Sequence, residues 1–210
     1  MSVRSYLDHN ATSPLRPEAR EAMIDALDCA GNPSSLHAEG REARAIVENA
    51  RETVAQIFQV MPQAVTFTSG GTEAANWLLQ HRDGVKLALS AVEHPCVLKG
   101  HRFPDGDVHA IPVSPEGIVE LGALEEALSL VAIVAVQAAN NETAVIQPLS
   151  DVASLTKAKG GFVVCDAVQA VGRVPSSSSW PLWQKSAVGA RCVARRRVTD
   201  ARNGYDKSEE

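Results

Sequence analysis

Residues 65–76 read VTFTSGGTEAAN, and this stretch decides the fold. A strand-forming run passes into a turn of Ser, Gly and Thr, and the turn opens a helix. Glycines let the backbone approach an anion closely, a helix start leaves free N–H groups, and the Thr72 hydroxyl adds a donor. The stretch therefore indicates a phosphate site. The alternative is a plain helix start, capped by Thr72 or Ser69 with Glu73 in its first turn.

Short apolar runs alternate with amphipathic helical segments on both sides of this turn. Strands are predicted at 65–68, 86–90, 108–113, 131–137 and 162–165. Helices are predicted at 17–30, 38–58, 72–79, 121–128 and 149–159. Such alternation is typical of an α/β fold built on a mainly parallel sheet.

The composition is that of a folded protein. Of 210 residues, 45% are apolar and 21% charged, and 20 Lys and Arg against 25 Asp and Glu give a net charge of −5. This balance excludes a wholly disordered chain and argues against nucleic acid as the main partner. The longest apolar run, at 128–136, is far shorter than the ~20 residues of a membrane helix, and the polar start lacks a signal pattern. We expect a soluble, cytoplasmic protein without a membrane partner.

The four cysteines are Cys29, Cys96, Cys165 and Cys192, and they lie far apart in the sequence. They form no C-x-x-C pair and no compact cluster with histidines, so neither a disulfide framework nor a metal site is encoded locally.

The charge changes sign near residue 175. Residues 176–210 carry seven Lys and Arg against four Asp and Glu, and the first 175 residues carry the acidic excess. The later stretch shows no strand or helix period. We therefore predict a domain at 1–175 and a divergent, disordered tail at 176–210. Three arginines at 195–197 are read as solvated charge, and nucleic-acid binding is the weaker alternative.

Three further candidates follow predicted strands, where α/β sheets position ligand groups. His94 follows the strand at 86–90. It could act as an acid or base, or lie flat on an aromatic ring, and the alternative is a loop residue with satisfied hydrogen bonds. Asn141 follows the strand at 131–137 and either binds a ligand or forms a turn. Asp166 ends the strand at 162–165, with Gln169 three residues on. It pairs with a protonated heterocyclic nitrogen or caps the next turn. His37 is a weaker candidate for a functional residue.

Six motifs occur in a fixed order: YLDHNAT at 6–12, GNPSSLH at 31–37, TSGGTE at 68–73, AVEHP at 91–95, NNET at 140–143 and DAVQAVG at 166–172. Together they closely resemble the cysteine desulfurases, in the class V aminotransferase group of fold-type I pyridoxal-phosphate (PLP) enzymes. The resemblance runs from residue 6 to 175. It implies the three-layer, mainly parallel α/β large domain of that fold type, here incomplete.

The resemblance also implies a role for each site residue. The Gly71 backbone and the Thr72 side chain would hold the cofactor phosphate, and His94 would stack on the pyridine ring. Asp166 would pair with the pyridinium nitrogen. Gln169 would bind the phenolic oxygen, with Asn141 near the same edge. Family members are homodimers that take sulfur from L-cysteine, leave alanine and an enzyme persulfide, and pass the sulfur to iron–sulfur scaffold proteins or other acceptors.

The family pattern stops after residue 175. The 210 residues contain no Ser-x-His-Lys run, so the Schiff-base Lys of the family is absent. Lys185 and Lys207 are not preceded by the Ser and His of that run. The family's substrate-binding Arg and nucleophilic Cys lie in a second half that has no counterpart here. We interpret Cys192 as an incidental thiol and Cys96 as a structural one. His9 stands where the family commonly has Asn.

The change at residue 175 predicts a truncated or frameshifted chain of little or no desulfurase activity. Reading the other two nucleotide frames beyond codon 175 for a Ser-x-His-Lys element tests the frameshift. The main alternative is a non-catalytic remnant that binds PLP or phosphate, or that pairs with a full-length relative. Selenocysteine lyase or another class V aminotransferase is the alternative activity.

Overall fold

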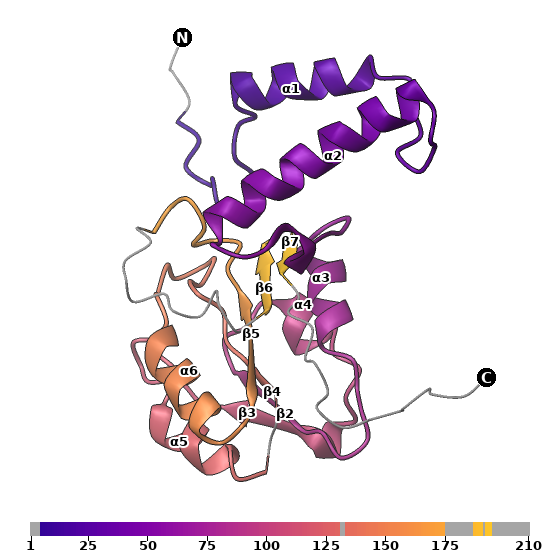
Figure 1. Ribbon diagram of the computed structural model, residues 1–210. Helices are drawn as coiled ribbons and strands as arrows, with labels where there is room; N and C mark the ends of the chain where they lie inside the picture. Colours follow the sequence, from indigo (N-terminus) through magenta and orange to yellow (C-terminus); the bar gives the residue numbers. More distant parts are fainter. Residues whose placement is uncertain (1–4, 131–132, 175–186, 191, 195–210) are drawn as a thin grey trace, which may run out of the picture.

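The computed structural model describes residues 5–130, 133–174, 187–190 and 192–194, and places a sheet between layers of helices (Figure 1). Along the chain the described elements are α1 (Pro17–Leu27), α2 (Ala38–Ile57), η1 (Pro62–Ala64), β1 (Val65–Phe67), α3 (Gly71–Leu78), β2 (Leu87–Ser90), α4 (Pro95–Leu98), η2 (Asp105–Asp107), β3 (Val108–Ile111), α5 (Leu121–Ala127), β4 (Ile133–Ala135), α6 (Leu149–Ala158), β5 (Phe162–Asp166), β6 (Ala187–Ala190) and β7 (Cys192–Ala194).

In the described residues the sheet has seven strands in the order β1-β7-β6-β5-β4-β2-β3. β7 is antiparallel to both its neighbours, and the other pairs are parallel. Leu87 of β2 is in register with Val108 of β3 on one side and with Ile133 of β4 on the other. All four residues of β2 are buried, as expected for an inner parallel strand covered on both faces.

Each face of the sheet has its own apolar core, because successive strand residues point to opposite faces. Figure 1 shows α5 and α6 on one face and α3 and α4 on the other. Val134 packs on the α5 and α6 side with Leu124 and Val152. Its neighbour Ala135 packs on the opposite side with Leu79 and Val97. The mainly parallel α/β sheet expected from the sequence is therefore confirmed.

The hairpin of α1 and α2 lies beyond one end of the sheet (Figure 1). α2 reaches the sheet through its last turns, where Ala55 and Val65 of β1 share a small core cluster. α1 has no buried residue, and Met23, Ile24 and Leu27 are 58%, 42% and 82% exposed.

Among the described helices, none combines the length and the apolar character that a membrane span requires.

The structure differs from the sequence predictions in the segment after residue 175. No strand was predicted there, but β6 pairs with β5, and β7 joins β6 to β1. These two strands were not predicted, because three- and four-residue strands are specified by their partners and carry too few residues to show a period. Trp180, Trp183, Lys185 and 195–210 lie outside the described residues, and the boundary at 175 stays a prediction.

Candidate functional site

The sheet brings the predicted site residues to one edge. β2, β4 and β5 run parallel, and β1 runs in the same direction because the antiparallel β7 separates it from β6. Thr72, His94 and Asn141 each follow the carboxyl end of one of these strands, and Asp166 is the last residue of β5. The carboxyl edge of a mainly parallel sheet is where ligands bind in open α/β folds.

The turn after β1 is held by Glu73 and has no side-chain cap. Gly70 is the N-cap of α3, and the Thr68 hydroxyl donates to the Gly70 carbonyl oxygen over 3.0 Å. Glu73 Oε2 accepts the Ser69 N–H at 2.6 Å, and its hydrogen bonds with Ser69 lower the pKa of Glu73. The side chains of Thr72 and Ser69 therefore do not cap the helix, which was the alternative interpretation of this turn.

An open groove of about 630 Å³ lies beside this turn, with Thr68, Ser69, Thr72 and Glu73 in its lining. Within the described residues, the Thr72 hydroxyl makes no hydrogen bond. Among the described residues, a Cβ on Gly70 would meet no atom within 4 Å, and one on Gly71 would meet only Val168 Cγ2 at 3.7 Å. The turn beside the groove thus offers a helix start, the free Thr72 hydroxyl and unobstructed backbone at Gly70 and Gly71, which together suit an anion.

Asp166 ends β5 in a partly buried position. Its Oδ1 accepts the Val168 N–H over 3.0 Å, so the turn-capping alternative describes a real contact. Burial raises the pKa of Asp166, while the Val168 N–H and nearby His94 oppose that shift. An aspartate with one oxygen taken by its own turn retains a second oxygen for a cationic partner.

His94 is exposed and begins α4, a four-residue helix that the sequence did not predict. Its Nδ1 accepts the Cys96 N–H over 3.1 Å. A neutral ring in this arrangement carries its proton on Nε2. The contact fixes the ring near Asp166.

The other edge of the site is joined to the start of the chain. Asn141 lies in the turn after β4, and its carbonyl oxygen accepts from Asn10 Nδ2 over 2.8 Å. Gln169 Nε2 donates to the Asn10 carbonyl oxygen over 3.2 Å, and Gln169 Oε1 accepts from Arg173. Arg173 also donates to Asn10 Oδ1 over 2.8 Å. The segment around Asn10 therefore links Asn141 with Gln169.

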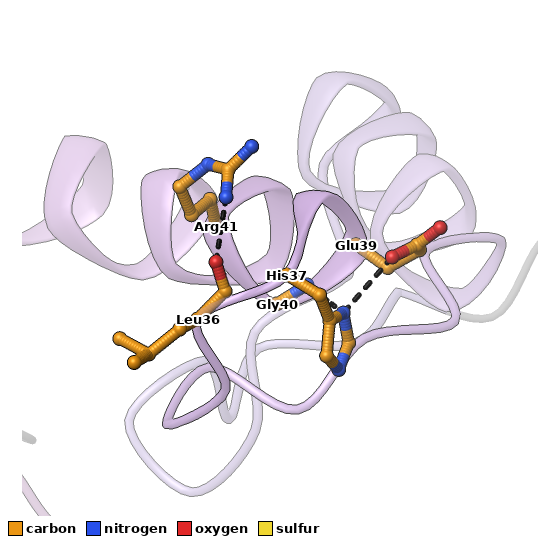
Figure 2. A network of polar contacts seen from close by, with 5 residues as sticks. All are labelled: Leu36, His37, Glu39, Gly40 and Arg41. Atoms are coloured by element: carbon orange, nitrogen blue, oxygen red, sulfur yellow. Dashed lines mark hydrogen bonds and ion pairs between the residues drawn. The ribbon is translucent and has the colours of Figure 1, made fainter.

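His37 lies at the start of α2, and none of its contacts involves the residues at the sheet edge. Figure 2 shows its Nδ1 facing Glu39 Oε2 at 2.9 Å and the Gly40 N–H at 3.3 Å. Arg41 NH1 donates to the Leu36 carbonyl oxygen in the same turn. These contacts define an exposed helix cap.

The sequence did not assign a role to Glu93, although it lies in the AVEHP motif. Glu93 is 4% exposed, and with Asp166 and Gly71 it lines a cavity of about 10 Å³. Asn10 and Arg173 were also missed. A charged residue three positions beyond a short buried strand was an available signal for Glu93. No local signal links Asn10 to Arg173, because they are far apart in the sequence.

These features define a three-layer α/β protein with a ligand-type site at the carboxyl edge of its sheet. The sequence profile of the class V aminotransferases matches residues 5–179, and the chain belongs to this family. The expectation drawn from the six motifs is thereby confirmed at the level of the family.

Curated relatives are named as cysteine desulfurases. "Cysteine desulfurase IscS" of Dictyoglomus turgidum is 38% identical over 189 residues, covering 83% of this chain and 47% of the relative. The "Cysteine desulfurase" of Cereibacter sphaeroides is 41% identical over 184 residues, covering 82% of this chain and 48% of the relative. The chain thus spans about half the length of the curated relatives it matches.

Solved structures agree on the fold. The NifS-like protein from Rickettsia africae superposes with a TM-score of 0.78 at 30% identity, covering 89% of this chain and 54% of that one. Another NifS-like protein gives a TM-score of 0.81 at 31% identity, covering 93% and 60%. The fold-type I large-domain architecture implied by the motifs is confirmed by these neighbours.

Proposed function

We propose that the chain is the cofactor-binding part of a PLP-dependent cysteine desulfurase. The observation that carries the proposal is that Gly71, which starts α3 beside Thr72, lines the same small cavity as Asp166 at one edge of the sheet. PLP has a phosphate at one end and a ring nitrogen at the other. A helix start suits the phosphate, and a carboxylate suits the ring nitrogen.

The residues present fit PLP in charge, and the glycine turn leaves room for its phosphate. The Thr72 hydroxyl lacks a partner within the described chain, and the backbone at Gly70 is open to a phosphate. Asp166 has a free oxygen, and burial strengthens its interaction with a cation. When bound, the cofactor supplies an electron sink next to the amino acid's α-carbon.

The chain's own residues would hold that group from three sides. Gly71 and Thr72 would bind the phosphate, and Asp166 would hold a proton at the ring nitrogen. His94 would stack on the ring, since its Nδ1 contact with Cys96 fixes the imidazole. Gln169 and Asn141 would contact the phenolic edge, and the Asn10 segment that joins them would hold both in position.

The proposed substrate is L-cysteine, whose C–S bond breaks to leave alanine and sulfur for an acceptor. The names of the relatives support this reaction, and so does a neighbour described as "SspA in complex with cysteine", which superposes with a TM-score of 0.73 at 26% identity. Iron–sulfur scaffold proteins as acceptors, a homodimer and the cytoplasm stay predictions. Relatives from Arabidopsis thaliana and Drosophila melanogaster are named mitochondrial.

We expect the 210-residue chain by itself to have little or no desulfurase activity. It has no Ser-x-His-Lys run to anchor the cofactor covalently or to move protons. The same observation favours a second candidate function, in which the chain holds PLP or phosphate non-covalently or pairs with a full-length relative. Sulfide and alanine released at enzymatic rates from purified chain, PLP and L-cysteine would refute the low activity. Size-exclusion chromatography with a full-length relative tests the pairing.

A PLP titration followed by absorbance tests the proposed site. Replacing Thr72 with Val should weaken binding about 10-fold, and replacing Asp166 with Ala should weaken it at least as much, because each removes a charge-assisted contact. Thr53→Val, on the exposed side of α2, is the matched control and should bind like the parent chain. Equal affinity in all variants, or no binding by the parent chain, would overturn the proposal.

Borohydride treatment and peptide mapping then show how the cofactor is held. We expect no reducible adduct on the chain. An adduct on Lys185 or another lysine would mean that the chain binds PLP covalently and that the low activity must be reconsidered.

A further inference from the structure

Glu93 is a buried acid with an unused oxygen. Its Oε1 accepts the Gln137 N–H over 2.7 Å, which ties it to the chain two residues beyond β4. Its Oε2 is buried and has no hydrogen-bond partner among the described residues. None of the ion pairs in that part of the chain involves Glu93. A carboxylate in this position would be desolvated and uncompensated, which is costly enough to favour the neutral acid.

Glu93 and Asp166 line the same cavity, which has about 10 Å³ of space, enough for about one water molecule. α3 and β4 line it with apolar residues, and β5 and α4 contribute Val164 and Val97. The titratable groups around the pair are Cys165 on β5, and His94 and Cys96 at the start of α4. The pair is therefore two acids in a largely apolar enclosure.

The proton of this pair belongs on Glu93. Burial, with the charge of Asp166, raises the pKa of Glu93 to about 8. Asp166 is less buried, accepts the Val168 N–H and lies near His94, so it keeps its negative charge more readily. The cysteines supply no positive charge. Burial raises the pKa of Cys96 to about 11 and that of Cys165 well above its usual range.

We propose that Glu93 is a protonated positioning residue that donates its O–H to the Asp166 carboxylate, directly or through one water in the shared cavity. The pair then carries a single negative charge, and that charge lies on Asp166 at the open side of the site. The orphaned Oε2 acquires a partner by this arrangement. The effect on cofactor binding rests on the function proposed above, but the proton on Glu93 does not.

Infrared spectroscopy of the purified chain tests the proton without any cofactor. At about pH 7 the difference spectrum between the parent chain and E93Q should show the carbonyl band of a protonated carboxylic acid. The band should disappear from the parent chain as the pH rises through about 8, which tests the same proton if E93Q does not fold. Glu52→Gln, an exposed position on α2, is the control and should leave the band unchanged. No acid band, or a band that survives in E93Q, would overturn the inference.

The pH dependence of unfolding gives a second readout. The pKa of Glu93 is higher in the folded chain, at about 8, than its reference value of 4.5. Its contribution to stability is therefore complete below about pH 4.5 and is lost as the pH rises to about 8. Because Gln cannot ionise, the Tm of the parent chain should fall relative to that of E93Q over this range and stay level above it. Parallel curves would contradict a proton on Glu93.

PLP affinity separates the positioning role from mere packing. At about pH 7, E93Q should bind PLP within about threefold of the parent chain, whereas E93L should lose about 10-fold, because Leu cannot donate to Asp166. Equal affinity of E93L would overturn the positioning role. An acid band in a chain that binds no PLP would refute the proposed function alone. PLP binding without an acid band would refute this inference alone.

Discussion

The Arg173 guanidinium donates to Asn10 Oδ1 over 2.8 Å and joins two residues 163 positions apart. The same side chain donates to the His9 carbonyl oxygen over 3.2 Å and to Ser13 Oγ over 3.3 Å. It also contacts Gln169, one of the proposed site residues. One cation thus fixes the start of the chain against the turn that follows β5.

Replacing Arg173 with Met should release this segment. We expect amide hydrogen exchange at 8–13 to quicken about fivefold, since the lost contacts are solvent-exposed and worth about 1 kcal/mol. Arg44→Met is the matched control, because Arg44 is exposed on α2 and makes no side-chain hydrogen bond or ion pair within the described chain. Unchanged exchange in the Arg173 variant would show that other contacts hold the segment.

Replacing Gly100 with Ala should destabilise the fold by about 1–3 kcal/mol. A Cβ at Gly100 would collide with the Cys96 carbonyl oxygen and the Asn76 side chain, where α3 meets the end of α4. In the amide orientation that satisfies both its oxygen and its nitrogen, Asn76 donates to the Gly100 carbonyl oxygen over 2.8 Å. The Asn76 side chain therefore cannot move away from an added Cβ without losing this hydrogen bond. Denaturant unfolding measures the change. Gly106→Ala, whose added Cβ meets no atom within 4 Å in the part of the chain that the structure describes, should be close to neutral.

Replacing Glu73 with Gln should lower the Tm near neutral pH and leave it unchanged in acid. The Ser69 hydrogen bonds hold the pKa of Glu73 below 4.5 in the folded chain. Its contribution to stability is therefore present above about pH 4.5 and is lost as the pH falls through the folded pKa. Thermal unfolding at several pH values measures the difference. A gap between the two chains that persisted in strong acid would contradict the role of the Glu73 charge.

The thiols of Cys29, Cys96 and Cys165 should react with an alkylating reagent at different rates. Cys165 is 2% exposed with a strongly raised pKa, and burial raises the pKa of Cys96 to about 11. Because the thiolate is the reactive form, both should react at least 10-fold more slowly than the half-buried Cys29. Mass mapping of timed samples measures the order, and denaturant should equalise the rates. Fast modification of Cys165 in the folded chain would contradict its burial.

The sequence determined the strand–turn–helix at 65–78 and most of the other elements, because hydrophobic periods and turn residues are local signals. α4 was missed because four residues starting at Pro95 are too short to show a helical period. The strands β6 and β7 were missed for a similar reason, since their pairing with β5 and β1 is fixed by neighbours distant in the sequence.

The sequence also placed Thr72, His94, Asn141 and Asp166 after strand ends, and parallel strands bring such positions to one edge. Only the tertiary structure brought Glu93 into the same cavity as Asp166, and Arg173 to Asn10. The physical reason is that burial and long-range hydrogen bonds depend on which elements pack together. Local sequence specifies the elements, whereas the packed sheet decides which acid loses its solvent and which side chains become partners.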